Sequence, residues 1–209
     1  MGRERQGVLI SFEGIEKVGK TTQIGRLAAW LRAKKFTVRV MREPGGTMLG
    51  ESLRSILLHQ GEIKSPQAEL LLFAAARAEL VREVLMPSLS RGEIVILDRF
   101  SDSSVAYQGF GRGIDVKWIQ SVNLHVTEGL SPNMTFLLQG PSFDQGDDNI
   151  EKAGREFFDR VKTGYNKIAA EDPSRWHIIP SARPIDEVAK DIQKLVSSYL
   201  MLGQDGIEG

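Results

Sequence analysis

The sequence predicts an α/β protein in which helices cover both faces of a parallel β-sheet. Strand-like and helix-like segments alternate along the 209 residues, which is the pattern of strand–helix–strand units. Several strand-like segments are continuous apolar runs, as is typical of strands buried on both faces. The first of them leads into a glycine-rich loop that is followed by helical periodicity. Together these features indicate a doubly covered parallel sheet.

Strands and helices are predicted in alternation from one end of the chain to the other. The strands are expected at 8–13, 37–41, 94–98, 135–139 and 176–180. The helices are expected at 20–34, 48–59, 66–85, 115–128, 150–171 and 184–201. The third helix has a clear start, because Ser65 can cap it and Pro66 suits its first turn. Turn-forming residues fill 140–149, which we expect to be a mobile loop, and 203–209 is expected to be a flexible tail.

The composition indicates one cytoplasmic domain. No repeat, linker or change in composition divides residues 1–209. The 27 basic and 27 acidic residues cancel, so no overall charge favours nucleic acid or a membrane. The chain has no cysteine, which excludes disulfides and cysteine-bound zinc and suits a reducing compartment. It also lacks a signal-peptide core and any apolar run near the roughly 20 residues of a membrane span.

The loop after the first strand has the pattern G-x-x-x-x-G-K-[ST], read here as Gly14-Ile15-Glu16-Lys17-Val18-Gly19-Lys20-Thr21. Glycines at its ends let the backbone N–H groups approach an anion. Lys20 is expected to reach the β- and γ-phosphates of a nucleotide, and the Thr21 hydroxyl to bind Mg²⁺. The N-terminus of the next helix faces the same phosphates. Because strand, loop and helix occur in the required order, the motif predicts nucleotide binding rather than a structural turn.

A carboxylate and an arginine follow the apolar strand at 94–98. Asp98 lies at the carboxyl end of this strand, where a doubly wound sheet places its ligand groups, and it is a candidate Mg²⁺ ligand. Arg99 is a candidate for stabilising the charge on a transferring phosphoryl group. The alternative is a capping aspartate followed by a solvated arginine. Beside a phosphate-binding loop, we favour the functional interpretation.

Three further segments carry side chains suited to a nucleotide base or phosphate. The turn at 42–47 reads Arg-Glu-Pro-Gly-Gly-Thr after the second strand, although a simple charged turn would look the same. Phe73 and Arg77 share one helix face and suit a planar base, but Phe73 alone would be assigned to the core. In the segment 103–109, Ser-Ser-Val-Ala-Tyr-Gln-Gly, Gln108 and the hydroxyls can read base edges or merely cap a helix.

In order and spacing, these motifs resemble those of the thymidylate kinase family. The resemblance covers about residues 7–200 and rests on the segments 12–21, 42–47, 72–77, 98–100 and 103–109. It implies a P-loop nucleoside-monophosphate kinase fold with a five-stranded parallel sheet. It also implies that MgATP phosphorylates dTMP to dTDP, and that the protein forms homodimers.

The resemblance also implies how a thymine base would be held. Phe73 matches the residue that stacks on thymine, and Arg77 matches the residue that donates a hydrogen bond to it. Ser104 and Gln108 match residues that line the base pocket. Tyr107 matches a residue that packs beside the deoxyribose.

Further matches concern the acceptor phosphate and sugar. Arg42, Arg54 and Arg99 match the arginines around the acceptor phosphate. Glu16 matches the loop acid that contacts the sugar 3′-hydroxyl. Phosphoryl transfer needs positioned cations more than covalent chemistry, so this set of residue types suits it.

The sequence departs from the family pattern at two places. Lys17 stands where bacterial relatives usually have a small residue and where relatives of the eukaryotic type have an arginine that contacts ATP phosphates. The lid at 140–149 is short and acidic, and the Asp-Arg-x-Glu motif at its end reads Asp-Asn-Ile-Glu at 148–151. No arginine lies between Arg112 and Arg155. We therefore interpret Lys17 as a replacement for part of the lid charge, the alternative being a solvent-facing lysine.

The sequence therefore predicts an ATP-dependent dTMP kinase. Lys20, Arg99, Glu16 and Lys17 are the candidate catalytic residues, and Mg²⁺ is the expected cofactor. One alternative is a kinase for another nucleoside monophosphate. The other is a nucleotide-binding module with impaired transfer, although 166–169 reads Asn-Lys-Ile-Ala and lacks the aspartate of a guanine-reading motif.

Overall fold

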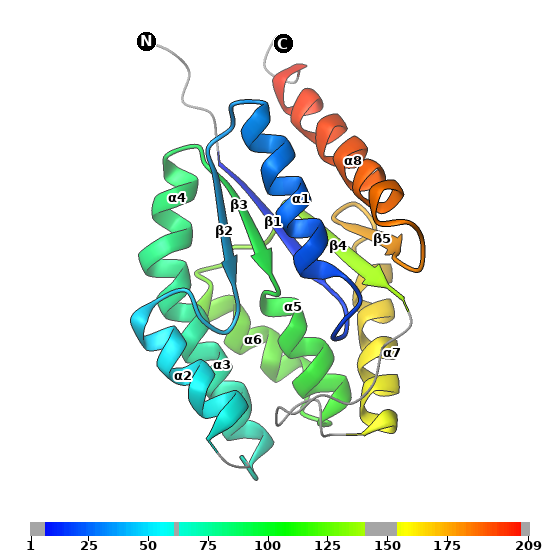
Figure 1. The fold of residues 1–209 in the computed structure, drawn as a ribbon. Coiled ribbons are helices and arrows are strands. Elements are labelled where there is room, and N and C mark those ends of the chain that lie inside the picture. The colour runs from blue at the N-terminus through cyan, green and yellow to red at the C-terminus, as the bar shows by residue number, and fades with distance from the viewer. Residues whose placement is uncertain (1–6, 61–62, 141–153, 206–209) are drawn as a thin grey trace.

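A single five-stranded parallel sheet forms the centre of the computed structural model, which describes residues 7–60, 63–140 and 154–205 (Figure 1). The strands are β1 (Val8–Glu13), β2 (Val38–Arg42), β3 (Ile94–Asp98), β4 (Met134–Gln139) and β5 (Trp176–Pro180). Their order across the sheet is β2-β3-β1-β4-β5, and all the neighbouring pairs are parallel. This confirms the predicted fold class.

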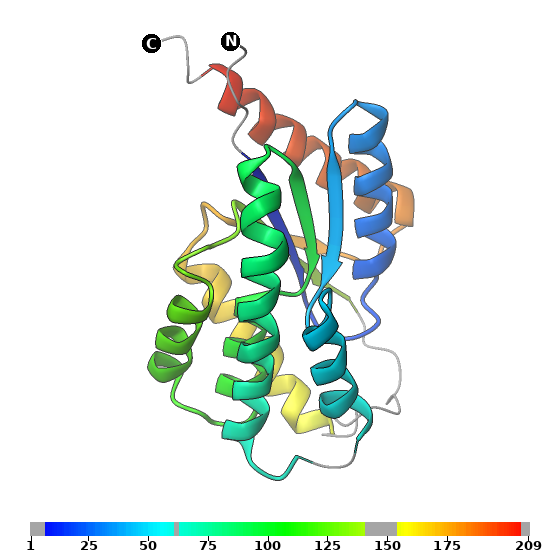
Figure 2. The same cartoon turned by 90° about the vertical axis from the view of Figure 1, so that its left-hand side faces the viewer.

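Helices cover both faces of the sheet. They are α1 (Lys20–Ala33), α2 (Met48–His59), α3 (Pro66–Leu80), α4 (Met86–Ser90), α5 (Ser101–Ser104), α6 (Val116–Val126), α7 (Arg155–Glu171) and α8 (Ile185–Asp205), with π-helical segments η1 (Val81–Leu85) and η2 (Val105–Gly111). Helices α1 and α8 pack together on one face, and the long α3–η1–α4 helix, α6 and α7 lie on the other (Figures 1 and 2). Within the described ranges, no helix is both long and apolar enough to cross a membrane.

Most predicted boundaries agree with the structure within about one residue, but some differ. The helix predicted at 66–85 continues through η1 into α4 and ends at Ser90, so its end was predicted too early. Residues 203–205 belong to α8, whereas we expected a tail there. Helix α5 and segment η2 were not predicted. The loop expected at 140–149 lies outside the described residues except for Gly140, as do 150–153 of the helix predicted at 150–171.

Side chains along a central strand point alternately to the two faces of the sheet, so the apolar core is divided between these faces. In β1, Ile10 and Phe12 pack in one cluster with Leu27 of α1. Leu9, on the opposite face, packs with Leu80 at the end of α3. Because successive side chains point to opposite faces, Ser11 and Glu13 lie on the same face as Leu9. Glu13 is therefore buried under the α3 and α7 side of the sheet.

The register of the sheet brings three chain segments together at one edge. Arg42 at the end of β2 pairs with Asp98 at the end of β3, and Asp98 also pairs with Phe12 of β1. Carboxyl ends of parallel strands are where open α/β sheets bind ligands. The phosphate-binding loop leaves β1 at this edge, so the predicted site residues converge there.

Candidate active site

The loop at 14–19 has the backbone conformation that an anion-binding loop requires. Gly14 has φ 126° and Gly19 has φ 98°, both in the region that favours glycine. A Cβ at Gly14 would lie 2.5 Å from the carbonyl oxygen of Leu138, so the loop packs directly on the end of β4. The side chains of Ile15 and Val18 are buried in the core. These two residues can therefore offer a phosphate only their main-chain N–H groups.

Lys20 is buried within the loop at the start of α1. Its Nζ donates hydrogen bonds to the carbonyl oxygens of Gly14 at 3.0 Å and Ile15 at 2.8 Å. Burial, followed by the positive charge of Arg99, lowers the pKa of Lys20 to about 8. An anion placed in the loop would favour the charged ammonium, because opposite charge raises the pKa of a lysine.

Thr21 and Asp98 meet across the mouth of the loop. The Thr21 hydroxyl donates to Asp98 Oδ2 at 3.2 Å. Two oxygen donors this close suit a hard divalent cation. In the part of the chain that the structure describes, no group of three His, Asp or Glu side chains could hold a metal by itself. An ion at Thr21 and Asp98 would thus take its remaining ligands from phosphate oxygens or water.

The Arg99 guanidinium is fixed above the loop by acidic and aromatic neighbours. Its Nη2 donates to Glu16 Oε1 at 2.7 Å and to the Tyr107 hydroxyl at 2.9 Å. The guanidinium also lies 4.9 Å from the Tyr107 ring centroid, within cation–π range. Tyr107 donates to the same Glu16 oxygen at 2.7 Å, whereas Glu16 Oε2 is buried and has no hydrogen-bond partner among the described residues. This second oxygen is available to accept a hydrogen bond from a ligand.

Backbone conformation helps to place Arg99. Its φ of 72° lies in the left-handed region, which is strained for a residue with a side chain. The Arg99 N–H donates to the Phe12 carbonyl at 3.0 Å, and the next N–H, of Phe100, donates to Glu13 Oε1 at 2.8 Å. Strand β1 therefore holds the turn in which this strained residue occurs.

Glu13 is a functional candidate that the sequence analysis missed. It is fully buried, and its Oε2 accepts hydrogen bonds from Ser103 at 2.6 Å and Tyr165 at 2.8 Å. Both hydroxyl oxygens in turn accept from Nη1 of Arg99, at 3.3 Å and 3.1 Å. Burial, followed by the charge of Asp102, raises the pKa of Glu13 to about 7. A glutamate at the end of a strand that is apolar except for Ser11 was the signal in the sequence.

Glu13→Gln is expected to change how stability depends on pH. A carboxyl group with a pKa of about 7 when folded and an ordinary value of 4.5 holds its proton more tightly in the folded state. Folding stability therefore falls as pH rises from about 4.5 to about 7, by about 3 kcal/mol from this group. Urea unfolding at several pH values should show the variant gaining stability relative to wild type across this range. A constant difference would contradict the assignment.

A buried ion-pair network surrounds Arg77 on the far side of the site. Its Nε donates to Glu43 Oε2 at 2.8 Å, and its side chain is only 1% exposed. Its Nη1 donates to Asn123 Oδ1 at 2.7 Å, and its Nη2 donates to the Ser104 hydroxyl at 2.9 Å. Burial raises the pKa of Glu43, while Arg77 opposes that shift. Arg77 is thus held rigidly with only N–H donors to offer.

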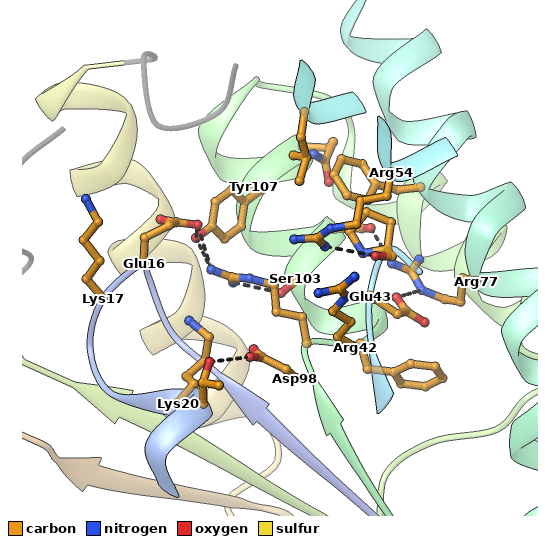
Figure 3. Close-up of a pocket in the computed structure, with 18 of the residues that line it drawn as sticks. Glu16, Lys17, Lys20, Arg42, Glu43, Arg54, Arg77, Asp98, Ser103 and Tyr107 are labelled. Carbon is orange, nitrogen blue, oxygen red and sulfur yellow. Dashed lines mark hydrogen bonds and ion pairs between the residues drawn. The ribbon is translucent and has the colours of Figure 1, made fainter. Parts of the chain in front are cut away.

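Arg42 and Arg54 lie between the two sides of the site. Arg42 Nη2 donates to Glu51 at 3.0 Å, and Arg54 Nη1 donates to the Pro44 carbonyl at 3.0 Å. Hydrogen bonding from the Gly46 N–H, and to a lesser degree from Arg42, lowers the pKa of Glu51. The turn at 42–47 is therefore more than a charged turn, because it directs two arginines toward the site (Figure 3).

One cavity of about 500 Å³ joins these groups. In Figure 3, Lys20 and Asp98 lie on one side of it and Glu43 and Arg77 on the other. The cavity is lined by most of the predicted site residues, which are Glu16, Lys17, Gly19, Lys20, Thr21, Arg42, Arg54, Phe73, Arg77, Asp98, Arg99, Ser104, Tyr107 and Gln108. Gly14 and Ile15 instead line a separate cavity of about 250 Å³ beside β4. Glu43 and Ser103 also line the larger cavity; Glu43 had no predicted role, whereas the Ser103 hydroxyl was one of those considered for reading a base edge.

A phosphate-binding loop that shares a cavity with arginines and an aromatic side chain defines a P-loop kinase acting on a small nucleotide-like acceptor. The family model for thymidylate kinase matches residues 12–192. The chain belongs to the thymidylate kinase family.

Individual relatives agree with this assignment. A thymidylate kinase from Bifidobacterium longum subsp. infantis is 42% identical over 204 residues, which covers 93% of this chain and 88% of that protein. A thymidylate kinase from Deinococcus radiodurans is 43% identical over 200 residues, which covers 92% of this chain and 97% of that protein. The crystal structure of thymidylate kinase from Ehrlichia chaffeensis superposes with a TM-score of 0.79 at 36% identity, covering 91% of this chain and 98% of that one.

Proposed function

We propose that the protein transfers the γ-phosphoryl group of ATP to dTMP, which gives dTDP and ADP. The observation that carries this proposal is that one cavity is lined by the phosphate-binding loop, by a cluster of arginines and by the aromatic side chain of Phe73. Membership of the thymidylate kinase family supports the same reaction. The acceptor is a phosphate oxygen that is already ionised at neutral pH, so the enzyme needs cations and alignment rather than a strong base.

On the donor side, the loop N–H groups and Lys20 would bind the ATP phosphates. Arg99 lies between donor and acceptor, where charge develops during transfer. Thr21 and Asp98 would hold a divalent cation, which we propose to be Mg²⁺. When bound, such an ion neutralises phosphate charge and helps to align the transferring group.

On the acceptor side, the residues divide into base, sugar and phosphate contacts. Phe73 would stack on thymine, with Arg77, Ser104 and Gln108 at its polar edge and Tyr107 beside the deoxyribose. Glu16 Oε2, which has no partner within the part of the chain that the structure describes, suits the sugar 3′-hydroxyl, since a buried acceptor favours a donor. Arg42 and Arg54, together with Arg99, would bind the acceptor phosphate as charge-assisted donors.

Lys17 is proposed to contribute positive charge to the ATP side. It lines the main cavity and is drawn beside Glu16 in Figure 3. The lid, from which relatives supply arginines, lies mostly outside the described residues. We expect Lys17→Ala to lower kcat by about ten-fold, because one cation near the transferring phosphoryl group is lost. Steady-state kinetics with saturating dTMP measures this, and a kcat within about two-fold of wild type would remove Lys17 from the mechanism.

The function is tested by ADP release with a panel of monophosphates. We expect dTMP to exceed UMP, CMP, AMP and GMP in kcat/KM by orders of magnitude. Preference for a different monophosphate would identify another nucleoside-monophosphate kinase. Binding of ATP and dTMP without any dTDP product would instead identify a nucleotide-binding module.

We also propose a homodimer. Leu71 of α3 and Leu124 of α6 are 50% and 61% exposed, and α3 and α6 pack side by side. Large apolar side chains on neighbouring helices favour a protein contact. Sedimentation equilibrium should therefore give twice the mass of the chain. Because the reaction consumes ATP, we expect it to occur in the cytoplasm.

A further inference from the structure

The side-chain amide of Gln108 has a fixed direction. Its Nε2 donates to Glu69 Oε1 at 2.8 Å, and both side chains are buried. A carboxylate can only accept hydrogen bonds, so the amide nitrogen of Gln108 must face it. The amide oxygen therefore lies on the other side of the group. Gln108 lines the main cavity, and with its nitrogen directed to Glu69 its amide oxygen is the group that can accept a hydrogen bond from a ligand there.

Glu69 itself is held in place by Arg112. Nη2 of Arg112 donates to Glu69 Oε2 at 3.0 Å, and its Nε donates to Oε1 at 3.3 Å. The guanidinium lies 4.8 Å from the ring centroid of Phe157 on α7. Residues from α3, the end of η2 and α7 thus immobilise the carboxylate. A rotation of the Gln108 amide would place its oxygen against this carboxylate, which two acceptors cannot tolerate.

The guanidinium of Arg77, which lines the same cavity, donates hydrogen bonds and cannot accept them. Among the described residues, Arg77 donates hydrogen bonds to three side-chain oxygens, and its guanidinium has N–H donors only. One of these partners, Ser104, lies four residues before Gln108 on the same continuous helix. Arg77, Ser104 and Gln108 all line the cavity. The polar edge of the pocket therefore combines donors from Arg77 with an acceptor from Gln108.

We propose that Glu69 is a positioning residue that sets the base specificity of this kinase. By orienting the Gln108 amide, it presents an acceptor to the N3–H of thymine, while Arg77 donates to the O4 carbonyl. Cytosine has the reverse pattern, an amino donor at C4 and an acceptor at N3, so both contacts would fail. The inference rests on the proposed function, since it concerns the acceptor base of that same site.

The test compares Glu69→Gln with Arg112→Lys. A glutamine at position 69 can accept or donate, so Gln108 becomes free to turn over. We expect the dTMP-to-dCMP ratio of kcat/KM to fall by about ten-fold in Glu69→Gln, mainly through KM. Arg112→Lys keeps the carboxylate and a cation beside it, so it should lower the melting temperature and leave the ratio within about two-fold of wild type.

A double-mutant cycle separates positioning from general stability. In a Gln108→Leu background, Glu69→Gln should no longer change the ratio, because no amide is left to orient. An unchanged ratio in Glu69→Gln with a lower melting temperature would make Glu69 purely structural and overturn the proposal. Equal changes in the two backgrounds would also overturn it.

Two measurements keep the result interpretable. If Glu69→Gln does not fold, NMR of the wild-type protein should show a Gln108 side-chain amide that is protected from hydrogen exchange, and an unprotected amide would refute the orientation. Calorimetric binding of dTMP and dCMP measures base discrimination without catalysis. Absence of dTDP formation by the wild-type enzyme would therefore count against the proposed function, whereas equal binding of both nucleotides would count against the specificity proposal.

Discussion

Arg99→Met is expected to lower kcat by about 10³ or more, with a smaller change in the KM for either nucleotide. An arginine placed on a transferring phosphoryl group contributes rate factors of about 10³ to 10⁵. The geometry supports such a role, since Glu16, Tyr107, Ser103 and Tyr165 fix both terminal nitrogens of Arg99. Rigid donors stabilise developing charge without reorganising during the reaction. Single-turnover kinetics would measure the chemical step directly.

Two control variants test whether the fall in kcat comes from the loss of the Arg99 guanidinium. Arg99→Lys keeps a positive charge but not the planar fork, so it should recover only part of the rate. Arg183→Met removes an exposed arginine that pairs with Asp191 away from the cavity, and it should leave kcat unchanged. If Arg99→Met kept kcat within ten-fold of wild type, charge stabilisation by Arg99 would be disproved.

The sheet could be predicted because its signal is local. Strands such as 94–98 are continuous apolar runs, and burial on both faces follows from that pattern alone. Helix α5 and segment η2 were not predicted, and Gly109 and Gly111 are residues that disfavour a helix in the sequence. Packing explains these glycines: a Cβ at Gly111 would lie 2.5 Å from the Phe157 ring of α7. Tertiary contact therefore overrides helix propensity here.

The site was predictable where a motif defines it and not where it depends on distant partners. The loop at 14–21, Asp98 and Arg99 follow from motif order and strand ends. The Glu43–Arg77 ion pair joins residues 34 positions apart. Spacing along the chain gives no indication of such a contact, because it depends on how β2 and α3 pack around the cavity.

Arg77→Met is expected to lower the free energy of unfolding by about 3 to 5 kcal/mol, because it leaves Glu43 as an unpaired buried charge. The two side chains are 1% and 4% exposed, so water cannot replace the lost partner. Asn123 and Ser104 lose a donor as well. For a chain of this length, the melting temperature should fall by about 6 to 20 °C. Differential scanning calorimetry without nucleotide would measure this fall.

The pH dependence identifies the cause of this loss. Burial already raises the pKa of Glu43, and removing Arg77 removes the charge that opposes this shift. The folded variant then holds the proton more tightly than the unfolded chain, so its stability deficit grows as pH rises above the ordinary glutamate pKa. Adding Glu43→Gln should restore part of the stability and abolish this trend. A melting temperature unchanged by Arg77→Met would show that Arg77 acts on the ligand alone, and the buried pair would then contribute nothing to the fold.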